Sequence, residues 1–294
     1  MKAAKRFLGQ FQIVRDIHSK IRGPQPVPPD VDLRAIEAKV LPPNRAFLQL
    51  AASSEKIEGM LSAFSMAAVD MMLSFQEGLG ANGSILEIGT YRGKSAVILG
   101  GHLRGAERLV LVDINDYLDR SAIEPTKQST DFILTPSERL RSALPNYRSR
   151  RGSFRFIHID ASHGYEETFQ ELGMADELLG PLGIIALDDF TNLNYSQNIA
   201  GIYKYLFTTD TKLTPLVVTD EKAYLCRRGE FDLFAPLVLN TALAEMKSRG
   251  IDPVLARTSY GPEYKAFYLR GRLPEEEGGF YGESIYKNAI IGAG

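Results

Sequence analysis

Two glycines and several acidic or hydroxyl side chains follow short apolar runs in the middle of this sequence. The run at 85–88 leads into Gly89 and Gly93, with the hydroxyl of Ser95 just beyond. Glycines let the backbone turn tightly and approach a ligand closely. Their spacing is not the G-x-G-x-x-G of a dinucleotide site, and Glu87 would repel a pyrophosphate. A carboxylate there suits a cationic ligand, such as the amino and sulfonium groups of S-adenosylmethionine. A turn with only a structural role is the alternative.

Two further positions fit an adenosyl ligand. Asp113 ends the next apolar run, about 20 residues beyond the glycine turn, where an acidic side chain can accept both ribose hydroxyls. A solvated loop aspartate is the alternative. Ser137 follows the third run and places a hydroxyl where an adenine edge could lie. Taken alone, it fits a helix N-cap better than a ligand contact. Ser95, at the start of a predicted helix, can hold a ligand carboxylate.

Three carboxylates follow the next two runs: Asp160 after the fourth, and Asp188 and Asp189 after the fifth. If they converge, they repel one another unless a cation or a proton lies between them. Oxygen ligands of this kind suit a hard divalent ion, and Mg²⁺ is the natural occupant. Any one of them could instead cap a helix or stabilise a turn.

A histidine lies close to these carboxylates. His163, three residues beyond Asp160, is placed to act as a general base near neutral pH. Asp160 and His163 are therefore the candidate catalytic pair. His158 lies within the preceding run, and we expect a structural role for it. By strand alternation it points away from the face used by Ile157 and Ile159.

These residues need a scaffold that brings the ends of the apolar runs together. The predicted strands are 84–88, 108–113, 131–134, 154–160 and 183–187, and the helices between them 94–103, 137–143 and 165–179. Such alternation predicts an α/β fold with a doubly wound, mostly parallel, Rossmann-like sheet. In such sheets ligands bind beyond the carboxyl ends of the strands. Further on we predict helices at 197–207 and 234–249, with strands at 216–219, 223–227 and 266–270. We expect the sheet to be complete by about residue 228.

The N-terminal part has a different pattern. Apolar residues at helical spacing predict an amphipathic helix within residues 1–22, and four prolines make 23–32 a stiff connector. A second helix is predicted from about Ser54 to Gln76. Its apolar side includes Ile57, Met60, Met71 and Met72, and methionines of this kind usually fill a core.

Overall composition narrows the classes of function. The 294 residues carry 34 basic and 36 acidic side chains, a formal net charge of −2, which disfavours a nucleic-acid substrate. The single cysteine, Cys226, cannot form an internal disulfide, and no apolar run approaches the ~20 residues of a membrane span. We therefore expect a cytoplasmic protein without a transmembrane segment.

The stretch 86–189 resembles class I S-adenosylmethionine-dependent methyltransferases, particularly the catechol O-methyltransferase-like, metal-dependent branch. Residues 86–96, Leu-Glu-Ile-Gly-Thr-Tyr-Arg-Gly-Lys-Ser-Ala, are similar to the first motif of that branch. The resemblance implies cofactor contacts from Glu87, Gly89, Tyr91, Ser95, Asp113 and Ser137. It also implies Mg²⁺ ligation by Asp160, Asp188 and Asp189.

Two departures from that branch resemble the sugar and macrolide O-methyltransferases, including the macrocin and mycinamicin types. His163 stands where the branch commonly has lysine, and Asp189 where it often has asparagine. The chain also has no tryptophan, although the catechol enzymes cover adenine with one. These departures favour a sugar or natural-product hydroxyl over a catechol.

The predicted organisation has three parts. Residues 1–79 form a helical extension, 80–230 the S-adenosylmethionine-binding methyltransferase domain, and 231–294 an appendage that supplies a lid, substrate contacts or subunit contacts. Candidate residues for lining the acceptor pocket are Tyr195, Tyr260, Tyr264 and Tyr281. A homo-oligomer formed through the first helix is possible.

The predicted function is Mg²⁺-assisted O-methylation of a small molecule. The first alternative is metal-independent transfer to another acceptor, with the aspartates only structural. The second is a catalytically inactive protein that binds the adenosyl cofactor and acts as a scaffold.

Overall fold

The computed structural model describes residues 47–257 and 266–271. The predicted first helix, the proline-rich connector and the candidates Tyr260, Tyr264 and Tyr281 lie outside the described residues. In the described part of the chain, no helix combines the length and apolar character needed to cross a membrane.

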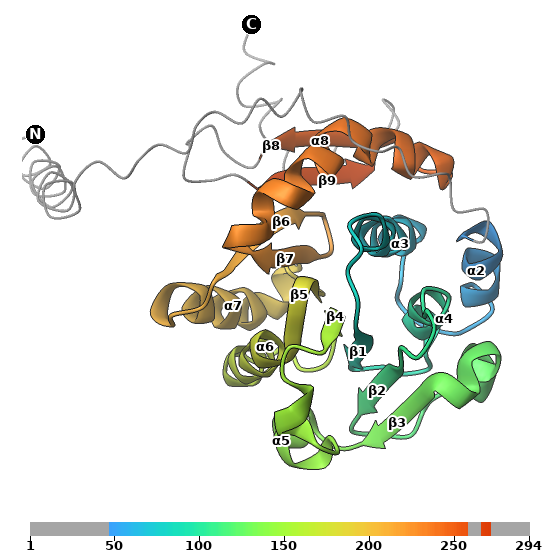
Figure 1. The fold of residues 1–294 in the computed structure, drawn as a ribbon, viewed down its shortest axis with the longest axis vertical. Helices are drawn as coiled ribbons and strands as arrows, with labels where there is room; N and C mark the ends of the chain where they lie inside the picture. The colour runs from blue at the N-terminus through green and yellow to red at the C-terminus, as the bar shows by residue number, and fades with distance from the viewer. Residues whose placement is uncertain (1–46, 258–265, 272–294) are drawn as a thin grey trace, which may run out of the picture. The chain divides into compact units, whose positions relative to one another are not determined.

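One nine-stranded sheet forms the centre of the described residues, in the order β3-β2-β1-β4-β5-β7-β6-β9-β8 (Figure 1). Neighbouring strands among β1 to β5 are parallel, whereas β7 runs antiparallel to both β5 and β6. The strands are β1 (Ser84–Ile88), β2 (Leu109–Asp113), β3 (Thr130–Leu134), β4 (Phe154–Ile159), β5 (Leu179–Leu187), β6 (Leu213–Val218), β7 (Ala223–Arg227), β8 (Pro253–Arg257) and β9 (Phe267–Gly271). The predicted mostly parallel α/β sheet is confirmed.

Helices cover both faces of this sheet. They are α2 (Phe47–Ser54), α3 (Ala63–Gly78), α4 (Lys94–Gly100), α5 (Leu140–Ala143), α6 (Tyr165–Leu178), α7 (Ser196–Thr208) and α8 (Phe231–Ser248). Figure 1 shows α3 and α4 on one side of the sheet and α6 and α7 on the other. Each face therefore has its own apolar core, as expected for a doubly wound sheet.

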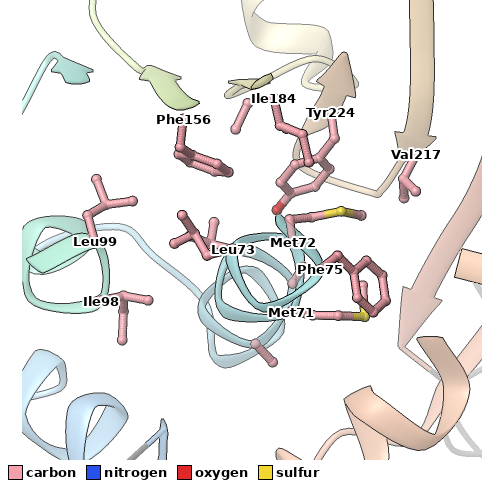
Figure 2. Close-up of a cluster of buried hydrophobic side chains, with 14 of the residues drawn as sticks. Met71, Met72, Leu73, Phe75, Ile98, Leu99, Phe156, Ile184, Val217 and Tyr224 are labelled. Carbon is pink, nitrogen blue, oxygen red and sulfur yellow. The ribbon is translucent and has the colours of Figure 1, made fainter. Parts of the chain in front are cut away.

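Helix α3 lies at the centre of the larger core and is buried nearly all round, from Ser65 to Gln76. In Figure 2 its side chains Met72 and Phe75 point toward Tyr224 and Val217 of the sheet, while Leu73 points toward Phe156. A helix that is apolar on every side belongs in a core. The prediction that Met71 and Met72 fill a core is confirmed, because both side chains are inaccessible to solvent.

The predicted single helix from Ser54 to Gln76 is wrong in its first third. Helix α2 ends at Ser54, and α3 begins at Ala63. The Ser62 side chain accepts a hydrogen bond from the Ser65 backbone N–H at 3.0 Å, which caps the start of α3. Residues 55–62 therefore form a loop, and Met60, expected on the apolar side, is 91% exposed.

The sheet also extends beyond residue 228, contrary to expectation. β9 pairs in parallel with β6, and β8 pairs antiparallel with β9. Helix α8 connects β7 to these strands and packs against α3. It begins at Phe231, three residues before the predicted start at 234, and contains Pro236 as the predicted helix did.

A buried ionic cluster joins α3 to α8 and α4. The Arg249 guanidinium donates to Asp70 Oδ2 at 2.7 Å, to Glu245 Oε2 at 2.6 Å and to Ser74 Oγ at 3.1 Å. His102, after α4, lies 2.8 Å from Asp70 Oδ1 through its Nε2 atom. These side chains are almost wholly buried, so each charge depends on its partners.

Candidate functional site

A cavity of about 860 Å³ opens at the carboxyl ends of the parallel strands. This is the position that an open α/β sheet offers to a ligand. The predicted site residues that line it are Gly89, Tyr91, Ser95, Asp113, Ser137, Asp160, His163, Asp188 and Asp189. Glu87 and Gly93 do not line the cavity and lie behind it.

Gly89 allows the loop after β1 to pass directly over the end of β4. Its φ is +88°, and a Cβ atom there would overlap the carbonyl oxygen of Asp160. The Gly89 N–H donates to Val112 O at 2.8 Å, and the Asp160 N–H donates to Ile88 O at 2.8 Å. The close approach therefore depends on the absence of a side chain.

We expect Gly89→Ala to lower the free energy of unfolding by about 2 kcal/mol or more, because it adds a backbone clash to the strain of a positive φ. Urea denaturation measures the change. Gly80→Ala is the matched control, since Gly80 has φ +76° and nothing within 4 Å of the added Cβ. Equal losses in the two variants would contradict a role for the close approach.

Gly93 and Tyr91 shape the same loop. Gly93 has φ +88°, and a Cβ there would lie 2.8 Å from Leu118 Cδ1, so its role in the structure is packing behind the cavity. Tyr91 lines the cavity and has a positive φ of 48°. Its hydroxyl donates to Glu58 Oε1 at 3.1 Å, which ties this loop to the loop 55–62.

Asp113 holds that loop from the end of β2. Its Oδ2 atom accepts backbone hydrogen bonds from Thr90 at 3.0 Å and Tyr91 at 2.8 Å, and its Oδ1 atom accepts one from Asn115 at 2.9 Å. Each carboxylate oxygen has more than one acceptor position. Asp113 can therefore order the loop and still face a ribose in the cavity.

Glu87 is buried beneath the cavity floor. Its Oε1 atom accepts a hydrogen bond from Ser95 Oγ and lies 2.8 Å from His158 Nδ1. Its Oε2 atom is also buried, and it has no hydrogen-bond partner among the described residues. The predicted structural role of His158 agrees with this arrangement, because the ring is buried among polar partners.

Ser137 lines the cavity at the end of β3, on the side where an adenine was predicted. The short 3-10 helix at Ser137–Arg139 begins after Pro136, with no side-chain capping bond. The alternative of a helix N-cap therefore has no support in the structure.

The predicted acidic residues do come together, but in two groups of possible ligands. We call His158, Asp160 and Asp188 the inner group, and Asp160, His163 and Asp189 the outer group. In each group one ligand atom per residue lies within 4.8 Å of the others. His163 Nε2 lies 3.3 Å from Asp189 Oδ2, and the His163 ring lies against Tyr195 with the centroids 4.0 Å apart.

Lys222 is a site residue that the sequence did not indicate. Its ammonium forms an ion pair with Asp188 Oδ2 and lies 3.1 Å from His158 Nε2. Burial acts to lower the pKa of Lys222, but Asp188 and Asp160 outweigh it and raise that pKa. The residue stands in a charged turn between β6 and β7, and such turns are usually exposed. No local pattern marks it as buried.

The electrostatics of Asp160 and Asp188 differ accordingly. Burial and the charge of Asp188 raise the pKa of Asp160 well above its usual value, and Lys222 offsets this only in part. Burial would also raise the pKa of Asp188, but Lys222 and His158 outweigh it and lower that pKa to about 2. Asp188 thus has a counter-ion in direct contact, whereas the charge of Asp160 is less fully compensated.

Part of the cavity wall comes from the loop 55–62, which was predicted to be helical. Glu58, Met60 and Leu61 line the cavity, and Glu58 lies 3.2 Å from Arg92 in an ion pair. The Ser62 hydroxyl donates to Glu221 Oε2 at 2.9 Å, so this loop is also held to the turn that carries Lys222.

Comparison with protein families identifies the segment that contains most of the site. Residues 86–190 match a family model described as a methyltransferase domain. This segment is a methyltransferase domain. The methyltransferase domain holds every predicted site residue from Glu87 to Asp189, on the Rossmann-like arrangement of β1 to β5. The loop 55–62 lies outside it and adds to the cavity wall, and Lys222, also outside it, is buried against Asp188 and His158.

Three of the solved structures that are similar to this chain each have a low sequence identity to it. They are cofactor-bound Rv0187 from MTB (18% identity, 69% of this chain and 99% of that one, TM-score 0.49), the O-methyltransferase NovP (13%, 56% and 79%, 0.45) and the SAH-bound Podospora anserina methyltransferase PaMTH1 (18%, 65% and 99%, 0.41). At these identities and TM-scores the likeness assigns neither a substrate nor a mechanism to this chain. No curated protein matches the sequence.

Proposed function

We propose that the protein transfers a methyl group from S-adenosylmethionine to a hydroxyl of a small molecule. The observation that carries this proposal is the pairing of two features in one cavity of the methyltransferase domain. A floor suited to a cationic adenosyl ligand, where Ser95 and Asp113 line the cavity and Glu87 lies beneath Ser95, lies next to a rim that holds His163 and Asp189.

The floor fits the cofactor chemically. Glu87 Oε2 is a buried carboxylate oxygen without a partner among the described residues, and leaving such an atom unsatisfied is costly. The amino group of S-adenosylmethionine, bound above this floor, is a cation that would offset the buried charge of Glu87. Asp113 and Ser137, on the next two strand ends, would face the ribose and the adenine.

The rim fits proton removal from an acceptor hydroxyl. His163 takes the hydroxyl proton while the acceptor oxygen attacks the sulfonium methyl carbon. The new carbon–oxygen bond forms as the carbon–sulfur bond breaks, and the electron pair stays on sulfur in S-adenosylhomocysteine. Asp189, 3.3 Å from His163, stabilises the imidazolium that results. Holding the two reactants in one cavity supplies much of the remaining rate gain.

The rim also fits a divalent cation. Asp160 is a carboxylate whose raised pKa reflects burial and the nearby charge of Asp188, and it lies in one ligand group with Asp189. These two carboxylates would hold Mg²⁺, which when bound lowers the pKa of an acceptor hydroxyl. A sugar or natural-product hydroxyl is the proposed acceptor class, following the His163 and Asp189 features.

A second candidate is methyl transfer without a metal, and the Lys222 ammonium favours it because it already neutralises Asp188. Activity that survives exhaustive chelation and is not raised by added Mg²⁺ would support this candidate. Loss of activity on chelation, restored by Mg²⁺, would support the metal-assisted reaction.

Cofactor binding tests the proposal directly. We expect calorimetry to detect binding of S-adenosylmethionine to the wild-type protein. Glu87→Gln should weaken that binding roughly tenfold, because it removes the negative charge beneath the cationic ligand. Glu124→Gln is the control, since Glu124 is exposed and pairs only loosely with Lys127 at 3.7 Å. Absence of binding to the wild-type protein would contradict the proposed function. If the cofactor binds, a screen of sugar and phenol acceptors is the next experiment.

A further inference from the structure

Lys222 occupies the inner group as a built-in cation. Its ammonium forms an ion pair with Asp188 and lies 3.1 Å from His158 Nε2, so it lies against two of the three inner-group residues. The Lys222 side chain is almost completely buried, so its ammonium has no access to bulk counter-ions and depends on these partners. A divalent cation in the inner group would have to displace this ammonium.

Both carboxylate oxygens of Asp188 already have a hydrogen-bonding or ionic partner. Its Oδ1 atom accepts a hydrogen bond from the Asp189 N–H at 2.9 Å, and its Oδ2 atom pairs with Lys222. Asp188 lines the cavity together with Asp160, His163 and Asp189, but it does not belong to the ligand group that those three residues form. The residue common to the two groups is Asp160.

The same ammonium is connected to the cofactor side of the cavity. From Lys222, contacts run through His158 to Glu87 Oε1, which also accepts a hydrogen bond from Ser95. The three residues in this series of contacts, Lys222, His158 and Glu87, are all buried. The Lys222 turn is itself held in place, because Thr219 Oγ1 accepts a hydrogen bond from the Lys222 N–H at 2.8 Å.

We propose that Lys222 is a positioning residue with two effects: it withholds Asp188 from divalent-cation binding, and through His158 it holds Glu87 in place beneath the cofactor side of the cavity. A cation at the rim is thereby restricted to Asp160 and its outer-group neighbours. This inference rests on the proposed function. It predicts effects of opposite sign on the two ligands when Lys222 is replaced, which a loss of structure alone would not produce.

The test uses the full-length protein and two binding measurements that need no turnover. Mn²⁺ binding is followed by electron paramagnetic resonance, and S-adenosylmethionine binding by calorimetry. The variants are Lys222→Met, Asp188→Asn and the double variant, with Lys247→Met as the control. Lys247 carries a 65% exposed side chain and lies on α8.

We expect Lys222→Met to bind Mn²⁺ about tenfold more tightly, because it removes a nearby positive charge and frees a carboxylate. The same variant should bind S-adenosylmethionine roughly fivefold more weakly, the effect of about one lost hydrogen bond. Asp188→Asn alone should weaken Mn²⁺ binding by no more than about the same tenfold electrostatic factor, because it leaves the Lys222 ammonium unpaired. In the double variant the same change should abolish the gain. Lys247→Met should match the wild-type protein in both measurements.

Three results would overturn the inference. One is that folded Lys222→Met binds Mn²⁺ no more tightly than the wild-type protein does. This includes the case in which neither of the two binds Mn²⁺. Another is a loss of Mn²⁺ affinity in Asp188→Asn far above the tenfold that the unpaired Lys222 charge accounts for, which would make Asp188 a ligand while Lys222 is present. The third is unchanged cofactor affinity in Lys222→Met. If Lys222→Met does not fold by circular dichroism, Asp188→Asn decides the first effect. Failure of the wild-type protein to bind S-adenosylmethionine would instead count against the proposed function.

Discussion

Replacing His163 with alanine should lower kcat by about 10²- to 10⁴-fold, the usual contribution of a general base. His163 is the only described histidine that lines the cavity, and Asp189 Oδ2 lies 3.3 Å from its Nε2 atom. Without the imidazole, the acceptor hydroxyl would have to lose its proton to water. The affinity for S-adenosylmethionine should stay nearly the same, because the cofactor residues lie on the other strand ends.

The measurement separates these two quantities: single-turnover kinetics for methyl transfer, and calorimetry for the cofactor. Tyr195→Phe is the matched control, since it keeps an aromatic ring against His163 and should retain most activity. Unchanged turnover in His163→Ala would remove His163 from the role of base. A parallel loss of cofactor affinity would indicate a disturbed cavity instead.

Replacing Arg249 with methionine should lower the free energy of unfolding by about 3–5 kcal/mol. Methionine retains much of the apolar volume but removes the donors to Asp70, Glu245 and Ser74. Two buried carboxylates would then lose their shared cation, and α8 would lose its polar attachment to α3. His102 would remain as a partner of Asp70 and limit the loss.

Urea denaturation followed by circular dichroism checks this expectation. Lys247→Met, two residues earlier, is the control. The Lys247 side chain is mainly exposed, and its ammonium lies as far as 3.9 Å from Asp252. Exposed pairs of this kind contribute little. If Arg249→Met were no less stable than Lys247→Met, the ionic cluster would not be what holds α8 to the core.

The sequence alone determined the elements of the methyltransferase domain and the residues at its strand ends. β1 to β5 are short apolar runs flanked by turns, and this pattern is complete within a few residues of each strand. Gly89 could be recognised because the need for a glycine at a tight turn is also local. Since parallel strands carry their carboxyl ends to one edge, the strand pattern by itself places Asp113, Asp160 and Asp188 together.

The boundary between α2 and α3 shows where local patterns fail. Ile57 and Met60 continue the apolar spacing of α3, so the pattern indicates one helix. The capping of α3 by Ser62 and the attachment of Ser62 to Glu221 break it into a loop that lines the cavity. Glu221 lies in a distant turn, and no window of sequence around residue 60 contains it.

Only the tertiary structure decided which charges pair. β7 lies between β5 and β6 and runs antiparallel to both, and this order carries the turn with Lys222 to the carboxyl end of β5. Asp188 is thereby neutralised from within, and Asp160 shares its open ligand group with His163 and Asp189. Burial of a charge depends on contacts between segments far apart in the chain. A charged turn has the same local sequence whether it faces water or a carboxylate. The sequence could therefore indicate three converging aspartates, but not that Lys222 would form an ion pair with one of them, Asp188.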